Sequence, residues 1–341
     1  MINFKSDYLE GAYPKIIERL AATNFEKTSG YGDDYHTENA RELIKKACKR
    51  DDVEVHFLVG GTQTNTTVIA SVLKPFEGVI CADTGHINCH ETGAIESTGH
   101  KVLALPSNGG KITASQIENY FTLCSTDPSY EHIVQPGMVY ISNSTETGNL
   151  YSKAELEEIS RVCKKCSLVL FLDGARLGYA LAAEENELTL SDYARLCDIF
   201  YIGGTKCGAL FGEAVVIVND NYKKDFRSYI KQRGGMLAKG RLLGIQFEVL
   251  FEGNTYIDIC KNAIDLAMEV RDGFAKKGYE FLFHSPTNQQ FPIIPDMKLR
   301  ELSEKYLFEF WQKVDDDHTA VRVCTSWATK RGDVLALLSE I

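Results

Sequence analysis

Between about residues 53 and 218 of this 341-residue chain, short apolar or β-branched runs alternate with amphipathic stretches. The runs have the length of strands and follow one another as VEVHFLV, GVICAD, KVLALP, GMVYISN, SLVLFLD, IFYIGG and AVVIVN. Parallel strands need long crossover connections, which are usually helices, so this alternation is typical of a parallel sheet. The pattern therefore predicts an α/β fold with a mostly parallel sheet covered by helices.

Two of the predicted crossover helices begin with a capping box. Thr113 is followed three residues later by Gln116, and Ser152 is followed at the same distance by Glu155. In this motif the two side chains satisfy each other's free backbone N–H groups at the start of a helix. Apolar residues then recur at helical spacing after Ser152, so helices are expected at both positions.

The last third of the chain follows a different pattern. Two helical stretches, IQFEVLFEG and NAIDLAMEVRDGFAKKG, precede strand-like alternation in YEFLFH and TAVRVCTSW. We expect an N-terminal arm at residues 1–30, a large domain at 31–245 and a small α+β domain at 246–341. No linker rich in Pro or in Ser and Gly separates these parts, which predicts that they pack together.

Charge and composition exclude several classes of function. The formal net charge is −10 and no long basic cluster is present, which argues against binding to nucleic acid. The start, MINFKSDYLEG, carries charges where a secretory signal would be apolar, and no run reaches the length of a membrane span. We therefore expect a cytoplasmic protein with no membrane partner. The ten cysteines are expected to be reduced.

The pair Cys163 and Cys166 has the spacing of some metal and redox sites. It closes a predicted helix instead of opening one, and no second pair of ligands stands at a matching distance. The sequence therefore predicts two structural cysteines and no metal site.

In an open parallel sheet, ligands bind beyond the carboxyl ends of the strands. The first predicted strand runs into a Gly-rich turn, Gly60–Asn65, that opens a helix. Backbone N–H groups at such a helix start suit a phosphate group. The turn matches neither the dinucleotide fingerprint nor the Walker motif, and an ordinary capped strand-to-helix turn is the more common explanation of such a segment.

Asp173 ends an almost wholly apolar run. A buried carboxylate needs a partner, and a protonated pyridine nitrogen is one possibility. The alternative is an ion pair with Arg176, three residues later.

Lys206 follows another apolar run and has small neighbours. Desolvation there would lower the pKa of its amine and favour covalent bonding to a carbonyl group, although a solvated surface lysine is the ordinary case. His86, after the run GVICAD, has the shape to stack on a flat ring, or it is a buried structural histidine.

The order of these features matches a known fold. A phosphate-type loop, a histidine, an aspartate and a lysine preceded by Gly-Gly-Thr follow one another as in the pyridoxal-phosphate enzymes of fold type I, the aspartate-aminotransferase-like fold. The chain resembles the L-threonine aldolases and related β-eliminating lyases. The segments that carry the resemblance are Phe4-Lys5-Ser6-Asp7, Gly32-Asp33-Asp34-Tyr35, Gly61-Thr62-Gln63-Thr64-Asn65, Asp173-Gly174-Ala175-Arg176, Thr205-Lys206 with Gly208, and Arg322 with Thr325, Ser326 and Trp327.

The resemblance implies a pyridoxal 5'-phosphate cofactor bound covalently to Lys206, with Asp173 at its pyridine nitrogen and His86 on its ring face. It assigns phosphate binding to Gly61, Thr62, Gln63 and Thr205. It assigns the substrate carboxylate to Ser6, Arg176 and Arg322. The implied reaction cleaves the Cα–Cβ bond of L-threonine or L-allo-threonine to give glycine and acetaldehyde. The implied partners are a small amino-acid substrate and further copies of the chain, in a homodimer or homotetramer with sites near subunit contacts.

One departure from the family pattern concerns the proton on the β-hydroxyl group. Many threonine aldolases show Asn-Thr-His where this chain has Asn143-Ser144-Thr145, so a second imidazole is absent from its usual place. We expect His86, His90 or a water molecule to act as the base. Three other interpretations of the function stay open. They are another pyridoxal-phosphate reaction (β-elimination, transamination or racemisation), a nucleotide-binding α/β protein, and an inactive scaffold.

Overall fold

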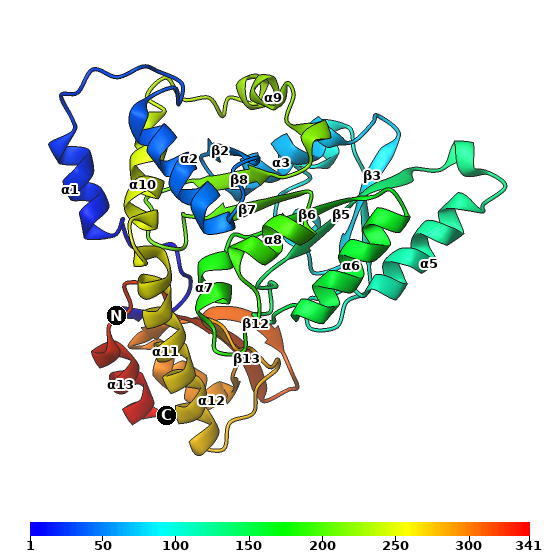
Figure 1. Ribbon diagram of the computed structural model, residues 1–341. Helices are drawn as coiled ribbons and strands as arrows, with labels where there is room; N and C mark the ends of the chain where they lie inside the picture. Colours follow the sequence, from blue (N-terminus) through cyan, green and yellow to red (C-terminus); the bar gives the residue numbers. More distant parts are fainter.

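The computed structural model describes residues 1–341 and has a seven-stranded sheet at its centre (Figure 1). The strands are β2 (Glu54–Leu58), β3 (Glu77–Ala82), β4 (Val102–Leu105), β5 (Gln135–Ser142), β6 (Val169–Asp173), β7 (Ile199–Gly203) and β8 (Glu213–Ile217). Their order is β2-β8-β7-β6-β5-β3-β4. Only β8 runs antiparallel to its neighbours, β2 and β7. The predicted mostly parallel sheet is confirmed.

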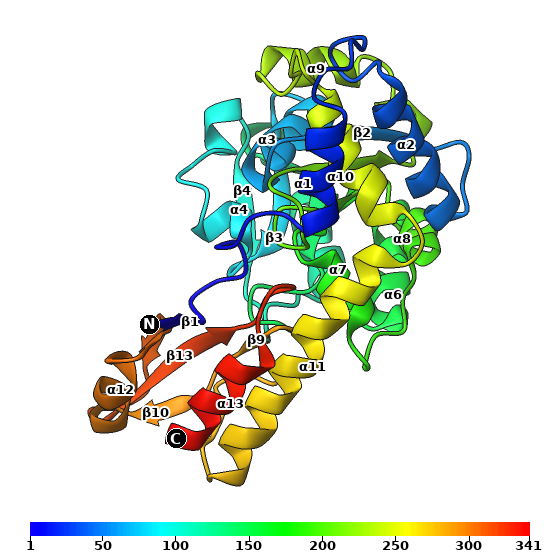
Figure 2. The same cartoon turned by 90° about the vertical axis from the view of Figure 1, so that its left-hand side faces the viewer.

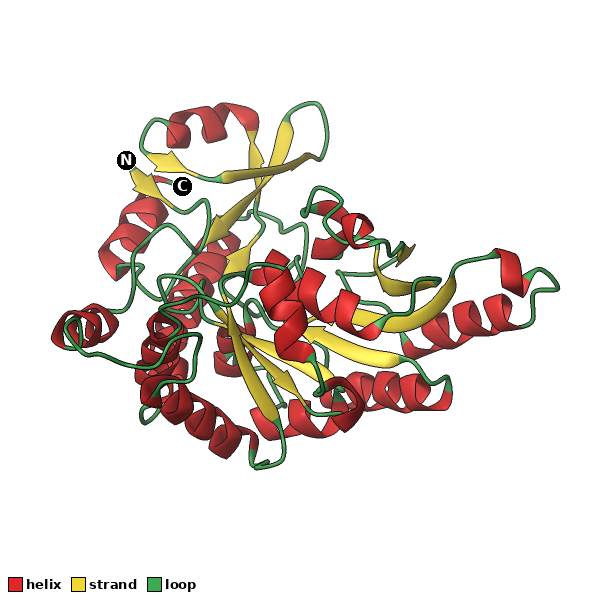
Figure 3. Cartoon of the chain, turned by 90° about the horizontal axis from the view of Figure 1, so that it is seen from above, coloured by secondary structure: helices red, strands yellow, loops and turns green.

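Helices cover both faces of this sheet, as Figure 3 shows from above. They are α2 (Tyr35–Cys48), α3 (Gly61–Val72), α4 (His86–Cys89), α5 (Ala114–Ser125), α6 (Lys153–Lys165), α7 (Leu177–Ala182), α8 (Leu190–Leu196), α9 (Phe226–Gln232) and α10 (Arg241–Phe251), with 3-10 turns at Glu96–Thr98, Tyr130–His132 and Asp220–Tyr222. Successive residues of β5 alternate between two separate cores, because strand side chains point to opposite faces. Both predicted capping boxes are present, at the starts of α5 and α6.

The chain from α11 onward builds a second, smaller core (Figure 2). Its elements are α11 (Thr255–Lys276), β9 (Gln289–Gln290), β10 (Ile293–Pro295), α12 (Asp296–Ser303), β11 (Tyr306–Leu307), β12 (Glu309–Lys313), β13 (His318–Cys324) and α13 (Arg331–Glu340). Strands β10, β13 and β12 form an antiparallel sheet in that order. None of the helices in the structure combines the length and the apolar composition that crossing a membrane requires.

One sequence expectation about this region is wrong. The segment YEFLFH, residues 279–284, forms only an isolated bridge between Phe281 and Pro292 instead of a strand. Its alternation arises because Tyr279 and Phe281 pack on the small core, while Phe283 lies edge-on to Phe291. The expected domain limit at 245/246 falls inside α10, and the buried side chains of the larger core continue through α10 and the first half of α11.

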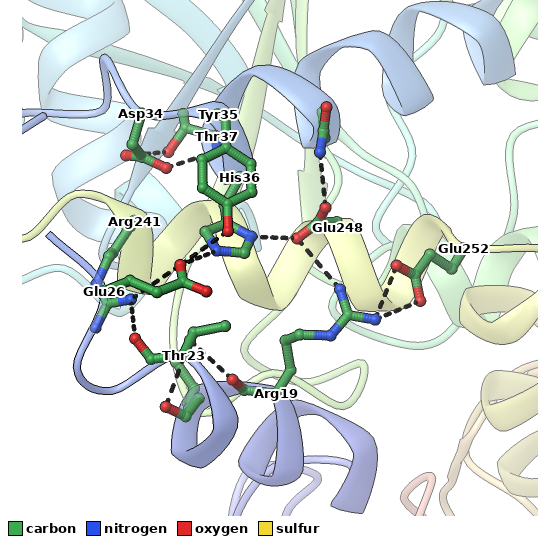
Figure 4. A network of polar contacts seen from close by, with 12 residues as sticks. Arg19, Thr23, Glu26, Asp34, Tyr35, His36, Thr37, Arg241, Glu248 and Glu252 are labelled. Atoms are coloured by element: carbon green, nitrogen blue, oxygen red, sulfur yellow. Dashed lines mark hydrogen bonds and ion pairs between the residues drawn. The ribbon is translucent and has the colours of Figure 1, made fainter. Parts of the chain in front are cut away.

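The N-terminal arm is tied to both domains. Strand β1 (Ile2–Asn3) pairs in parallel with β11 of the small domain, and helix α1 (Pro14–Ala22) packs on α10. Figure 4 shows the polar network that holds α1 and the following loop. In it, His36 lies between Glu248 (2.7 Å from Nδ1) and Glu26 (3.1 Å from Nε2), and Arg19 binds Glu252 at 3.0 Å. The arm between β1 and α1 is thereby anchored at both of its ends.

Candidate active site

Two adjoining cavities lie beyond the carboxyl ends of the parallel strands, where such sheets bind ligands. The inner cavity, of about 290 Å³, lies at the ends of β2, β5, β6 and β7. It is lined by most of the residues that the sequence singles out: Gly61, Thr62, His86, Asp173, Arg176, Thr205 and Lys206. The outer cavity, of about 480 Å³, faces the small domain and includes Arg322. The fold therefore gathers residues from positions 61 to 322 at one place.

The turn after β2 leaves backbone donors unused. Gly60 has an extended backbone, with φ of −178° and ψ of 167°, and α3 begins after it without a side-chain cap. The N–H groups of the first turn of a helix have no partner within the helix, so they are free for an anion. The Gln63 side chain is engaged elsewhere, since it accepts from the N–H of Val59 and donates to the carbonyl of Arg233, both at 3.2 Å. Gln63 lines neither cavity, so its side chain is not placed for the predicted phosphate contact.

Lys206 follows β7 and lines both cavities. Its amine forms no hydrogen bond or ion pair, while its carbonyl accepts from the hydroxyl of Tyr179 at 2.5 Å. Burial, followed by the positive charge of Arg176, lowers the pKa of the Lys206 amine. A lysine amine that loses its proton more easily is a better nucleophile, as the sequence predicts for this position.

Asp173, at the end of β6, is buried and held by three donors. Its Oδ2 accepts from the hydroxyl of Tyr140 at 2.5 Å and from the amide of Asn65 at 3.3 Å, and its Oδ1 accepts from the N–H of Ala175 at 2.9 Å. The alternative ion pair with Arg176 is not formed. The carboxylate is fixed in orientation and lines the inner cavity without a cationic side chain bound to it.

His86 begins α4 and is oriented by a buried carboxyl group. Its Nδ1 lies 2.8 Å from Oε1 of Glu91, whose side chain is fully buried and which also accepts from Asn65 at 2.7 Å. A carboxylate can only accept, so Nδ1 carries the proton and Nε2 is left as the free ring nitrogen. The imidazole lines both cavities.

Of the three residues predicted to bind the substrate carboxylate, Arg176 and Arg322 line the cavities and Ser6 does not. Arg176 is bound by Asp7 of the arm, with Nε–Oδ2 at 2.7 Å and Nη2–Oδ1 at 2.9 Å, which leaves Nη1 without a protein partner. Ser6, beside Asp7, is buried and lines neither cavity. Arg322 lines the outer cavity, where its Nη1 donates to Gln289 at 3.1 Å and its Nη2 to the carbonyl of Lys5 at 3.0 Å.

The sequence reasoning missed Glu146, which lines both cavities. Thr145, in the place of the absent histidine, is fully buried and turned away, because its hydroxyl lies 3.2 Å from the carbonyl of Gly109 and 3.0 Å from the N–H of Asn149. Glu213 was also missed; it accepts from the N–H of Gly204 at 3.1 Å, and burial raises the pKa of its carboxyl group. The rule that polar residues after a parallel strand mark a site would have found Glu146, four residues beyond the end of β5.

Comparison with known proteins shows which families this chain is similar to. The family model for the beta-eliminating lyases matches residues 3–305. The chain is 31% identical to a low specificity L-threonine aldolase of Pseudomonas sp. over 344 residues, which cover 99% of this chain and 96% of the relative. It is 43% identical to the threonine aldolase of Leishmania major in a solved structure, with a TM-score of 0.97 and coverage of 99% and 98% of the two chains.

A more distant likeness concerns the fold alone. A double mutant of the aspartate aminotransferase of Thermus thermophilus superposes with a TM-score of 0.73 at 12% identity, covering all of this chain and 90% of the other. The fold is therefore the aspartate-aminotransferase-like fold that the sequence pattern predicts. Together with the match that spans most of its length, this establishes that the chain belongs to the beta-eliminating lyase family.

Proposed function

We propose that this protein is a pyridoxal-phosphate-dependent lyase that cleaves the Cα–Cβ bond of β-hydroxy-α-amino acids, with L-threonine and L-allo-threonine giving glycine and acetaldehyde. The observation that carries the proposal is the meeting of Lys206, Asp173 and the uncapped start of α3 around one cavity. The relatives named as low specificity L-threonine aldolases support the choice of substrate.

The residues of the inner cavity fit pyridoxal phosphate. Lys206 offers an amine that has no protein partner, for the covalent bond to the aldehyde carbon. The free N–H groups at the start of α3, with Thr62 and Thr205 beside them, suit a phosphate group. Asp173 suits a protonated pyridine nitrogen, because it is buried, oriented by three donors and free of any cation. His86 supplies a flat ring on the same cavity.

The protein's part in the reaction is to choose which bond at Cα breaks. When bound, pyridoxal phosphate supplies an electron-accepting ring for the electron pair released at Cα. Arg322, with Nη1 of Arg176, would bind the substrate carboxylate, because guanidinium groups donate two parallel hydrogen bonds to such a group. Fixing the carboxylate and the amine sets the orientation of the Cα–Cβ bond, and this orientation decides that this bond is the one to break.

The test is a product analysis with purified, cofactor-loaded protein. Incubation with L-threonine and L-allo-threonine should release acetaldehyde and glycine in equal amounts. The family's name makes β-elimination the second candidate, and that reaction would release a keto acid and ammonia instead. Keto acid in place of acetaldehyde would overturn the aldolase assignment, and loss of the α-proton with change of configuration would indicate racemisation.

We also propose that the active form is a homodimer or homotetramer in a reducing compartment such as the cytoplasm. Large apolar side chains are exposed on the arm and on the segment that follows it, namely Tyr8, Leu9, Ile17, Phe25, Tyr31 and Tyr35. An exposed set of this kind is typical of an interaction surface. The ten cysteines are all free and nine are buried, which fits a reducing environment. Light scattering of the purified protein should give two or four times the mass of one chain.

A further inference from the structure

Five side chains line both cavities and therefore mark their junction: Tyr8, His86, Glu146, Arg176 and Lys206. Glu146 is the only carboxyl group among them. On the proposed function, the reacting carbon is held at Lys206 in the inner cavity, and the substrate carboxylate reaches Arg322 in the outer one. The Cα–Cβ bond and the β-hydroxyl group must then lie near this junction, within the region that Glu146 borders.

One carboxylate oxygen of Glu146 accepts two hydrogen bonds, and the other accepts none. Its Oε1 accepts from the hydroxyl of Ser142 at 2.7 Å and from the backbone N–H of His86 at 3.0 Å. Its Oε2 is enclosed and has no hydrogen-bond partner. A buried acceptor without a donor is unfavourable, so a hydroxyl group that donates to it would be bound favourably. The carboxyl group is thus fixed in place with one acceptor left over.

Three other groups that could accept this proton are committed or displaced, and the ring of His86, which also borders the junction, is assigned to the face of the cofactor. Thr145 is buried and engaged with Gly109 and Asn149, away from both cavities. Asp173 already accepts from three donors at the inner end of the site. His90 lines only the outer cavity, and burial lowers the pKa of its imidazole, which makes it a weaker base.

We propose that Glu146 is the catalytic base that removes the proton from the β-hydroxyl group of the substrate, in place of the imidazole that this chain lacks at residue 145. The O–H bond breaks and its proton passes to the Glu146 carboxylate. The electrons of the O–H bond form the C=O bond of the aldehyde as the Cα–Cβ bond breaks. Cα gains one proton from water to complete glycine, and Glu146 returns one to water, so atoms and charge balance without an oxidant or a reductant.

The electrostatic surroundings support a basic carboxylate. Burial raises the pKa of Glu146, and the negative charge of Asp173 adds to this, while the hydrogen bonds from Ser142 and from the N–H of His86 oppose it. A carboxylate with a raised pKa is a stronger base than an ordinary one. The titratable groups that face Glu146 are Asp173 on β6, Tyr140 on β5, Cys81 on β3, Tyr151 before α6, and His86, Arg176 and Lys206 across the cavities.

The test is Glu146→Gln in the cofactor-loaded protein. The amide keeps one oxygen for Ser142 and for the N–H of His86, so the loop after β5 should keep its shape. Threonine cleavage should fall by about 10²- to 10⁴-fold, the usual worth of a general base. Glycine has no β-hydroxyl group, so its binding, followed by cofactor absorbance, and the exchange of its α-proton in D₂O should stay within about threefold of wild type, because losing the base should not disturb them.

The pH profile gives a separate readout. The basic form of Glu146 exists above its pKa, so wild-type cleavage should rise with pH through that value, and Glu146→Gln should lose this rise. Glu42→Gln, an exposed glutamate on α2 that lines neither cavity, is the matched control and should behave as wild type.

Two results would overturn the assignment: cleavage by Glu146→Gln at the wild-type rate, or an equal fall in cleavage and in glycine α-proton exchange. If Glu146→Gln does not fold, Glu146→Asp keeps an ionisable group, and its pH profile should shift; an unchanged profile would refute the role. A wild-type protein that exchanges the α-proton of glycine but releases no aldehyde from threonine would instead refute the proposed function.

Discussion

Asp7 and Arg176 form a buried, two-point ion pair that joins positions 169 residues apart, with Nε–Oδ2 at 2.7 Å and Nη2–Oδ1 at 2.9 Å. Asn288 of the small domain donates to the same carboxylate at 2.9 Å. One side chain of the N-terminal arm thereby connects the large domain, the small domain and the edge of the active site. It also partly neutralises Arg176, which the family resemblance assigns to the substrate carboxylate.

Asp7→Asn should destabilise the protein strongly. Breaking a buried ion pair from one side leaves an uncompensated charge, which typically costs about 3–5 kcal/mol of unfolding free energy. The asparagine keeps one acceptor for Asn288 but removes the charge that faces Arg176. Urea unfolding would measure the loss, with Asp33→Asn at an exposed pair as the control. A change below 1 kcal/mol would show that Arg176 finds another partner.

The same pair predicts a dependence of stability on pH. Burial alone would raise the pKa of Asp7, but the charges of Arg176 and Lys206 and the hydrogen bonds from Arg176 and Asn288 outweigh it and lower the pKa well below its usual range. In the unfolded chain, the pKa of an aspartate carboxyl group is about 3.9. The contribution of Asp7 is therefore complete above that pH and is lost as the pH falls below it. Acid unfolding of Asp7→Asn should be less steep below about pH 4 than that of wild type.

Reduction of the cofactor-loaded protein with borohydride should fix the cofactor to Lys206. The amine has no protein partner, and burial lowers its pKa, so it is the nucleophile best placed in the inner cavity. Peptide mapping identifies the modified residue, and Lys206→Ala should carry no adduct, whereas the exposed Lys231→Ala should be labelled as wild type. An adduct on another lysine would contradict the assignment.

Asp173→Ala should retain some cofactor through the start of α3 but lose most activity. Removing one preorganised electrostatic partner typically costs about 2.7–4 kcal/mol of transition-state stabilisation. Asp173→Asn serves as the matched variant, because it keeps the shape and an acceptor for Tyr140 but not the charge. Both variants should be slow in threonine cleavage. Normal turnover in Asp173→Asn would mean that the charge of Asp173 is not needed.

Arg322→Ala should mainly weaken the binding of α-amino acids. Losing one charge-assisted partner of a buried carboxylate typically costs about 2–5 kcal/mol. Titration with glycine, followed by cofactor absorbance, measures this loss, and the cofactor itself should stay bound because Arg322 lines only the outer cavity. Arg331→Ala, on an exposed ion pair, is the control. Unchanged affinity for glycine would move the carboxylate role to Arg176.

The sequence by itself determined the parallel sheet, the capped starts of α5 and α6, and the order of loop, histidine, aspartate and lysine. These features are local, because strand length, capping boxes and the polar residue after an apolar strand are set by neighbours within a few positions. Because most strands of the sheet are parallel, their carboxyl ends lie at the same edge. The sequence alone therefore predicted that Asp173 and Lys206 belong to one site.

Only the tertiary structure decided how the charges pair and which side chains reach the cavities. The partner of Arg176 is Asp7, 169 positions away, and no local pattern favours it over Asp173. Whether Thr145 or Glu146 faces the site depends on the path of the loop after β5, which Gly109 and Asn149 fix from outside the motif. Such contacts join segments that the fold brings together, so they depend on packing between elements and not on the spacing of residues along the chain.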